Sequence, residues 1–565
     1  MKKLFTGLLF LAFAAGIRAQ STAMVNRSAS KPGSTTTAKK RLNVVFFLVD
    51  DMGWSDLGIQ GSKFYETPNI DRFARENVRF TQAYAACHVC SPTRASIISG
   101  SYPARLHLTD WLPGRKEFSF QKLKNADHVQ HLPYGQLTLP EILRENGYAT
   151  AIIGKWHLGM DSASTQRQGF DLHIPDYNVG WPNGTYFSPY HMKGLEGGPD
   201  GEYLTDRITD EALKWIENNK DHPFFLYLAH FAVHDPIEGR PDLVEKYEKK
   251  LKQMPAKHGS PFVLEENPDS PDPLGSDQLN DLLLDERYAG FGNLPDRVVK
   301  VKQFQDNPQY AAMVESVDES MKRVLDKLKA LGLDDNTVVI FFCDNGGMSA
   351  MNIGNPARRV SAANLDKAYS TSNLPLRGGK GWLYEGGIRE PLIVHWPHQD
   401  KPGVCNVPVI STDFLPTILD MAGIQVPKQY SGDGMSFTAL LKDPQSDPAP
   451  LEKRALYWHF PQYSNHGAQS PGGAIRYGDY KLIEYFENYK VQLFNLKDDP
   501  GEQNDLAASE PGKVKELRDM LHAWRKQVNA NMPTPNPDYD PSLHDQWQNW
   551  VKPAAKTQAP KTGEE

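Results

Sequence analysis

Cysteine is scarce in this sequence. The chain has 565 residues and only four cysteines, Cys87, Cys90, Cys343 and Cys405. So few cysteines in so long a chain exclude a disulfide scaffold. Cys87 and Cys90 have the spacing of half a zinc site, but no second cysteine pair follows at the distance that zinc fingers use. We therefore do not expect a structural zinc ion.

The chain also lacks a strong charge imbalance and a long basic run. It has 62 Lys and Arg residues against 69 Asp and Glu residues, a formal net charge of −7. Binding to nucleic acid needs a basic surface, so we expect no nucleic acid partner. Apolar residues make up 39% of the chain, which excludes a disordered or collagen-like protein and favours a globular one.

No hydrophobic run is long enough to span a membrane, which takes about 20 residues. Two lysines directly after the initiator methionine precede a mostly apolar segment, residues 4–16, and then residues 17–20. This order is typical of a secretory signal peptide, which we predict over residues 1–20. We therefore expect an exported protein, periplasmic or secreted, with no membrane span.

The body of the chain alternates between apolar strands and amphipathic helices. The strands are largely continuous apolar runs, typical of strands buried on both faces of a mostly parallel sheet. They are predicted at residues 43–49, 148–153, 224–233 and 337–342. Apolar residues from Met313 to Leu331 recur every three or four positions, which predicts a helix that stops at Gly332. The alternation predicts an α/β domain over residues 41–450, with a large mixed, mostly parallel sheet sandwiched by helices.

The remaining segments differ in composition from this body. Residues 21–40 are rich in Ser, Thr and Lys and predict a flexible spacer. Residues 451–531 contain short strands with turn signals between them and then a helix, which predicts a smaller C-terminal α+β subdomain. Residues 532–565 predict a Pro-rich and charged tail. Residues 251–308, rich in Pro and Asp, are predicted to form a long loop.

Acids, bases and metal ligands follow the four predicted strands. In an open α/β sheet, ligands bind at the carboxyl ends of the strands. Any single one of these residues could be a helix cap. Because such residues follow all four strands at the same edge of the predicted sheet, we favour a functional site. The carboxylate and amide oxygens among them suit Ca²⁺ or Mg²⁺ better than a soft metal. The residues are Asp50, Asp51, Lys155, His157, His234, Asp344 and Asn345.

The sharpest local signal is Cys90-Ser91-Pro92-Thr93-Arg94, followed by an apolar stretch and a glycine. It resembles the signature of the formylglycine-dependent sulfatases, a branch of the alkaline phosphatase superfamily. Thr93 stands where Ser is frequent in that signature, a mild departure. The resemblance covers most of the chain, in matching order and spacing, through blocks at residues 50–53, 154–159, 232–236, 316–318, 344–347, 379–381 and 385–389.

The resemblance implies an activity and cofactors. The activity would be hydrolysis of a sulfate monoester on an alkaline phosphatase or sulfatase type of fold. In this family a maturation enzyme oxidises the signature Cys to formylglycine, whose hydrated aldehyde is the nucleophile, so Cys90 would be that residue. The resemblance favours one Ca²⁺ ion, with Asp50, Asp51, the modified Cys90, Asp344 and Asn345 as its ligands.

The resemblance also implies roles for the basic residues. Arg94 would orient the diol of the hydrated aldehyde. Lys155 and Lys380 would neutralise sulfate oxygens. His234 would protonate the leaving ester oxygen, and His157 would take a proton from the second diol hydroxyl and so expel sulfate. Such groups are needed because negative charge grows on the leaving oxygen during attack.

Two other functions stay open from the sequence. A phosphodiesterase or phosphonate monoester hydrolase on the same fold could use the same charges, although Cys90 in its full context argues against it. A non-catalytic glycan-binding protein would tolerate loss of the nucleophile, acid or base, and none of these is missing here.

The expected substrate is a sulfated sugar or glycan. Residues 108–111 are similar to blocks in bacterial sulfatases that act on sulfated sugars. Three inserts, at residues 116–131, 176–200 and 251–308, are expected to wall the site and restrict action to a terminal sulfated sugar. The alternative is that they pack elsewhere on the surface, because loops tolerate insertions. Aromatic residues in predicted loops fit stacking against a sugar, although most such residues are simply packed. They are Trp111, Trp181, Trp382, Trp458 and Tyr463.

Overall fold

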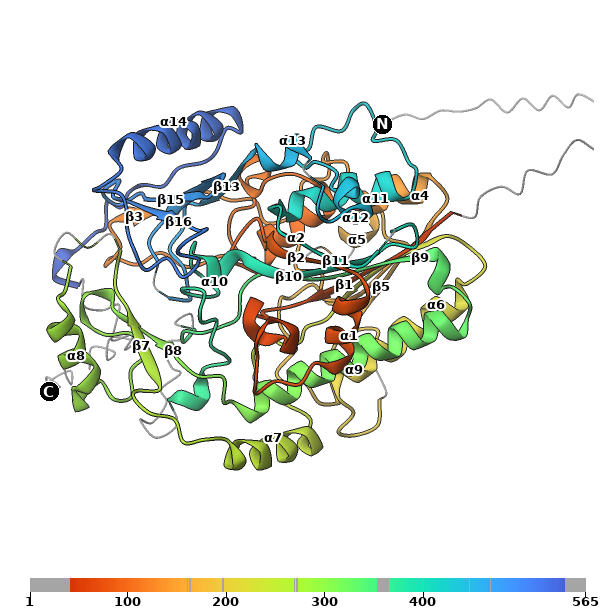
Figure 1. Ribbon diagram of the computed structural model, residues 1–565, viewed down its shortest axis with the longest axis horizontal. Helices are drawn as coiled ribbons and strands as arrows, with labels where there is room; N and C mark the ends of the chain where they lie inside the picture. The colour runs from red at the N-terminus through yellow and green to blue at the C-terminus, as the bar shows by residue number, and fades with distance from the viewer. Residues whose placement is uncertain are drawn as a thin grey trace, which may run out of the picture. The chain divides into compact units, whose positions relative to one another are not determined.

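The structure is a computed structural model (Figure 1). It describes residues 41–543, except 160, 162–163, 196–197, 269, 271–272, 353–364, 400, 447 and 468. The predicted signal peptide and spacer, residues 1–40, and the end of the predicted tail, residues 544–565, lie outside the described residues. Every helix in the described part of the chain is too short or too polar to cross a membrane.

A mixed, mostly parallel sheet forms the centre of the described residues. β1 pairs in parallel with β6 and β9, and β4 pairs in parallel with β5 and β6, whereas β10 runs antiparallel to both of its neighbours. The strand order is β11 (Gly403–Cys405), β2 (Val78–Tyr84), β10 (Arg389–His395), β9 (Thr337–Cys343), β1 (Asn43–Val49), β6 (Phe224–Ala229), β4 (Ala149–Gly154) and β5 (Leu172–Ile174), and β12 (Val409–Ile410) also pairs with β2. The predicted sheet is confirmed.

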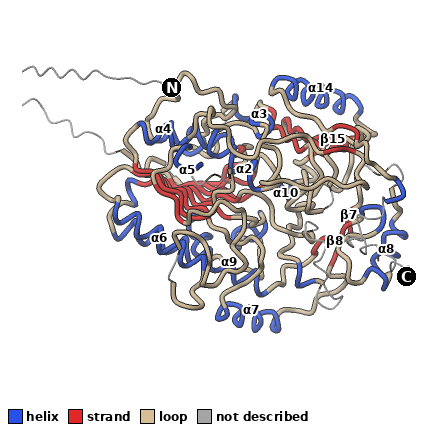
Figure 2. The backbone as a smooth tube through the Cα atoms, turned by 180° about the vertical axis from the view of Figure 1, so that it is seen from behind, coloured by secondary structure: helices blue, strands red, loops and turns tan. Residues whose placement is uncertain are grey.

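Helices cover both faces of this sheet (Figures 1 and 2). In β1, Val45, Phe47 and Val49 belong to one apolar cluster, and the alternate residues belong to the other. Two buried faces explain why the strand is continuously apolar. One cluster contains residues of α1 (Pro68–Glu76), α6 (Leu204–Asn218), α7 (Pro241–Gln253) and α9 (Pro308–Ala330), and the other contains residues of α2 (Cys90–Ser99), α4 (Leu139–Glu145), α11 (Phe414–Met421) and α12 (Thr438–Lys442).

The C-terminal part forms a separate antiparallel sheet with a helix against it, as predicted. Its apolar residues, among them Leu482, Leu517 and Leu521, pack in a third cluster. The elements are β13 (Ala455–Phe460), β14 (Gly472–Tyr477), β15 (Tyr480–Tyr485), β16 (Val491–Asn495) and α14 (Pro511–Gln527).

The prediction of a long loop over residues 251–308 is wrong. The segment contains α8 (Ser276–Leu284) and a two-stranded antiparallel sheet of β7 (Phe262–Glu265) and β8 (Val299–Lys302). Val299 and Val301 are buried in the third apolar cluster, so the alternating Val-Lys-Val-Lys pattern of β8 was a strand signal. Shorter elements are β3 (Leu123–Lys124), which pairs with β17 (Thr534–Pro535), and α3 (Pro103–Leu106), α5 (Ser164–Arg167), α10 (Glu385–Ile388) and α13 (Ala449–Glu452).

Candidate active site

Four parallel strands bring the predicted site residues to one edge of the central sheet. β1 ends directly before Asp50, and β9 ends directly before Asp344. β4 ends directly before Lys155, and the chain continues from β6 to His234 within five residues. The edge is the one at which α/β proteins bind ligands, because parallel strands share a carboxyl end.

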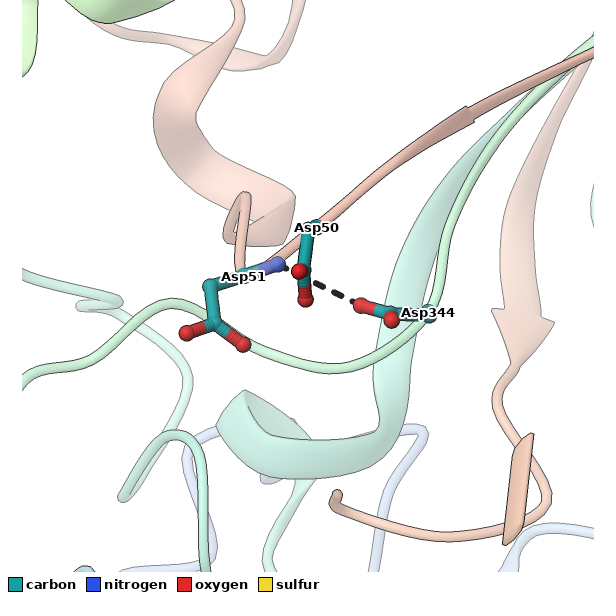
Figure 3. A group of neighbouring side chains, drawn as sticks. All are labelled: Asp50, Asp51 and Asp344. Atoms are coloured by element: carbon teal, nitrogen blue, oxygen red, sulfur yellow. Dashed lines mark hydrogen bonds between the residues drawn. The ribbon is translucent and has the colours of Figure 1, made fainter. Parts of the chain in front are cut away.

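Three buried carboxylates meet at this edge (Figure 3). Oxygen atoms of Asp50, Asp51 and Asp344 lie within 4.8 Å of one another, and all three residues are buried. The backbone N of Asp51 donates to Oδ1 of Asp344 at 3.3 Å. Asn345 joins the cluster, because its Nδ2 donates to Oδ1 of Asp51 at 2.7 Å.

This cluster fits a divalent cation that prefers oxygen ligands. Oδ1 of Asp50 and Oδ1 of Asn345 are buried and have no hydrogen-bond partner. Burial and the neighbouring Asp344 raise the pKa of Asp50 above its ordinary value. Crowded carboxylates of this kind are costly to bury unless positive charge offsets them. Hard oxygen ligands suit Ca²⁺ or Mg²⁺.

Two lysines contact the cluster. Nζ of Lys155 donates to Oδ2 of Asp50 at 2.5 Å, and Nζ of Lys380 donates to Oδ2 of Asp51 at 2.7 Å. Both lysines are buried. Burial would lower the pKa of Lys380, but Asp51 outweighs it and raises that pKa, so Lys380 stays charged.

Arg94 contacts the carboxylates rather than the side chain of residue 90. Its Nε donates to Oδ2 of Asp344 at 2.8 Å, and its Nη1 donates to the backbone oxygen of Lys155 at 2.9 Å. Nη2 lies 3.9 Å from Oδ2 of Asp50 and has no hydrogen-bond partner. Arg94 therefore holds Asp344 in position and leaves its Nη2 group for another ligand.

Cys90 is the first residue of α2, and His157 faces it. Sγ of Cys90 lies 3.2 Å from Nδ1 of His157. Nε2 of His157 lies 2.7 Å from the backbone oxygen of Leu112, which can only accept a hydrogen bond. Burial and Lys155 hold the pKa of His157 well below its ordinary value. His157 is therefore neutral, with its hydrogen on Nε2 and a lone pair on Nδ1 that points to residue 90.

His234 lies near the carboxylate of Asp51. Its Nδ1 lies 2.8 Å from the backbone oxygen of Asp235 and 2.9 Å from Oδ1 of that residue, and its Nε2 lies 3.7 Å from Oδ2 of Asp51. Burial and Lys380 would lower the pKa of His234, but Asp51 and Asp235 raise it to about 9. In this arrangement Nδ1 is anchored and Nε2 carries a proton.

A cavity of about 540 Å³ opens onto this group of residues. Such a volume is typical of a pocket for a small ligand. Trp111 and Trp181 line it, with ring centroids 6.3 Å apart, whereas Trp382, Trp458 and Tyr463 are buried in the third apolar cluster. Of the predicted site residues, Cys90, His157, His234 and Lys380 line the cavity.

Several residues that line the cavity were not predicted from the sequence as site residues. Asn465 and His466 lie in the loop between β13 and β14 and line the cavity, as does Asn352. These three residues occur in no recognisable motif. Asn465 and His466 lie far along the chain from the other cavity residues, and their loop packs against Gly381. Asp235, which the sequence did not single out, anchors His234.

One block that contributes to the resemblance lies away from the cavity. Asp318, on α9, accepts hydrogen bonds from the backbone N of Ile70 at 2.7 Å and of Asn69 at 3.0 Å. These residues belong to the first turn of α1, whose N–H groups have no partner within the helix. Asp318 therefore caps α1 from a neighbouring helix.

Known proteins resemble this chain over most of its length. The family model described as Sulfatase matches residues 42–424, and the model described as N-sulphoglucosamine sulphohydrolase, C-terminal, matches residues 379–530. The chain is 27% identical over 544 residues to the N-acetylglucosamine-6-O-sulfatase of Bacteroides thetaiotaomicron, covering 87% of this chain and 88% of that protein. It is 30% identical over 429 residues to the N-acetylgalactosamine-6-sulfatase of Mus musculus, covering 72% of this chain and 68% of that protein.

A solved structure shares the fold. It is that of a protein in complex with its substrate D-glucosamine-2-N,6-O-disulfate, with a TM-score of 0.61 and 23% identity, covering 87% of this chain and 98% of that one. The carboxylates, the two histidines and both lysines all lie within the segment that the Sulfatase model matches. The chain belongs to the sulfatase family, with the alkaline phosphatase-like fold of sulfatases, and it is a sulfuric ester hydrolase.

Proposed function

We propose that this sulfatase releases sulfate from a sulfated sugar, using formylglycine made from Cys90 and one Ca²⁺ ion. The observation that carries the proposal is the 3.2 Å approach of Sγ of Cys90 to Nδ1 of His157, beside the carboxylate cluster and in the same cavity. A buried structural thiol needs no base aimed at it.

Asp50, Asp51, Asp344 and Asn345 would hold the Ca²⁺ ion, together with the side chain of residue 90. Their free buried oxygens and their crowded charge fit such an ion. When present, formylglycine supplies a hydrated aldehyde as nucleophile, and Ca²⁺ supplies positive charge beside it.

Residues of the chain itself would transfer the protons and bind the sulfate group. Nδ1 of His157 bears the lone pair that faces residue 90, so it accepts a proton from that side chain. Nε2 of His234 lies close to Asp51 while Nδ1 is anchored by Asp235, so Nε2 is placed to donate a proton to the leaving ester oxygen. Nζ of Lys380 lines the cavity and attracts the sulfate oxygens.

Three features support a sulfated sugar as the substrate. Trp111 and Trp181 present aromatic rings to the cavity, and such rings pack against sugar faces. The relative in Bacteroides thetaiotaomicron is named for a sulfated amino sugar, and the solved protein was bound to one. The predicted signal peptide over residues 1–20 supports a periplasmic or secreted protein, where a maturation enzyme would have acted on Cys90 beforehand.

A panel of sulfated mono- and oligosaccharides tests the proposal. The purified protein is expected to release sulfate from at least one sulfated sugar faster than phosphate from the matching sugar phosphate. Release of phosphate from a phosphodiester or a phosphonate monoester, without release of sulfate from any sugar, would contradict it.

A further inference from the structure

His466 is a buried imidazole at the wall of the cavity, and both of its ring nitrogens lack a hydrogen-bond partner. Only 6% of the residue is exposed. Buried polar side chains nearly always have a partner in folded proteins. An unsatisfied imidazole that lines a cavity therefore indicates a ligand group that completes its hydrogen bonds.

The backbone holds His466 next to the catalytic residues. Its N–H donates to Oγ of Ser464 at 3.1 Å, and it forms a β-bridge with Asn352. Gly381 has a φ of +94° and packs so closely that a Cβ atom there would lie 2.4 Å from the backbone oxygen of His466. Because Gly381 directly follows Lys380, this packing sets the position of the imidazole relative to the Lys380 ammonium group.

The chemistry of the imidazole matches a hydroxyl group better than a sulfate group. Burial and Lys380 lower the pKa of His466 to about 3, so the ring is neutral and offers one donor and one acceptor. Sulfate oxygens only accept hydrogen bonds, and the charged Lys380 on the same cavity wall is the better donor for them. A hydroxyl group both donates and accepts.

We infer that His466 is a specificity-determining residue that hydrogen-bonds a sugar hydroxyl beside the sulfate ester. It thereby selects a polyhydroxylated substrate over an aryl or steryl sulfate of similar reactivity. The inference rests on the proposed function and adds the residue that recognises the sugar. The recognition comes from the loop between β13 and β14, whereas the residues proposed for the chemistry come from α2 and from segments that connect strands of the central sheet.

The test compares two substrates in the full-length protein and in His466→Phe, which keeps the ring volume and removes both nitrogens. The substrates are the sulfated monosaccharide that the wild type hydrolyses fastest and 4-nitrophenyl sulfate. The ratio of their kcat/KM values is expected to fall about 10- to 100-fold in His466→Phe, as for loss of a buried hydrogen bond. Removing the contacted hydroxyl from the sugar should lower kcat/KM in the wild type and have no further effect in the variant.

Two further measurements distinguish loss of sugar recognition from a general effect on folding. The Tm of His466→Phe should equal or exceed that of the wild type, because no protein hydrogen bond is lost. His173→Phe, the same change on β5 outside the cavity, should keep the wild-type substrate ratio. Equal losses on both substrates in His466→Phe, or a marked fall in its Tm, would overturn the inference. A wild type that releases sulfate from no sugar would instead overturn the proposed function, and the inference with it.

Discussion

Sγ of Cys90 and Nδ1 of His157 lie 3.2 Å apart, and the opposite nitrogen of the ring is held by the backbone oxygen of Leu112. A carbonyl oxygen cannot donate, so it fixes the hydrogen of His157 on Nε2. The nitrogen that faces residue 90 is then always the basic one. This relationship joins the start of α2 to the loop after β4 and places the proposed nucleophile beside its proposed base.

The first prediction is that the mature, active protein carries formylglycine at position 90. Mass spectrometry of the peptide that contains residue 90 measures the modification directly. Cys90→Ala should lower turnover by roughly 10⁴-fold or more, because the nucleophile is lost. Cys405→Ala, which also removes a buried thiol, but from β11 at the edge of the sheet, should keep activity. A fully active protein in which residue 90 is entirely a thiol would refute the mechanism.

The second prediction concerns the metal. Asp51→Ala and Asp344→Ala should each abolish bound Ca²⁺ and nearly all activity, because too few carboxylates remain to offset dehydration of the ion. Elemental analysis of the purified proteins measures the ion. Asp318→Asn changes a buried carboxylate that caps α1, outside the cluster, and should leave the ion bound. Active wild-type protein without any divalent ion would contradict the assignment.

The sheet and much of the site could be predicted because their signals are local. Alternate residues of β1 face two apolar clusters, so burial on both faces leaves a continuous apolar run in the sequence. The carboxyl ends of parallel strands share one edge, so Asp50 and Asp344 could be placed together although they are far apart in the chain.

The remaining features depend on packing between distant segments. His466 reaches the cavity because its loop packs on Gly381, and nothing near residue 466 in the sequence indicates that contact. The contact of Arg94 with Asp344 depends on where α2 lies relative to the end of β9, which motif spacing does not define. Residues 251–308 were predicted to be a loop because their Pro and Asp content outweighed the short alternating pattern of β8.

The third prediction isolates His157. His157→Ala should slow the step that expels sulfate from residue 90, because Nδ1 of His157 is the neutral, basic nitrogen that faces that side chain. The sulfated enzyme should therefore accumulate during turnover, and mass spectrometry of acid-quenched protein detects it. His157→Ala protein that is inactive and carries no sulfate on residue 90 would argue for a role before bond cleavage instead.

The fourth prediction isolates His234. If its Nε2 protonates the leaving oxygen, His234→Ala should lower kcat on substrates with poor leaving groups by about 10²- to 10⁴-fold, the range of general acid catalysis. Activated aryl sulfates, whose leaving groups need little protonation, should lose much less. Measuring kcat across a series of leaving-group pKa values checks this. A uniform loss across the series would exclude the general acid role.

The fifth prediction concerns the shape of the site. Of the three inserts expected to wall the site, the segment 176–200 supplies Trp181, Pro182 and Gly184 to the described lining of the cavity. Residues 251–308 form a two-stranded sheet and a helix and supply no residue to that lining. The loop between β13 and β14 forms another part of the cavity wall. A walled cavity of about 540 Å³ accommodates the end of a glycan chain more readily than the middle of a polymer. In an oligosaccharide series, sulfate should therefore be released faster from terminal sulfated units than from internal ones. Trp181→Ala removes a side chain from the cavity wall, so it should reduce this preference for terminal units. Equal rates on terminal and internal sulfates in the wild type would indicate an open cleft and contradict exo action, while the sulfatase activity itself would stand.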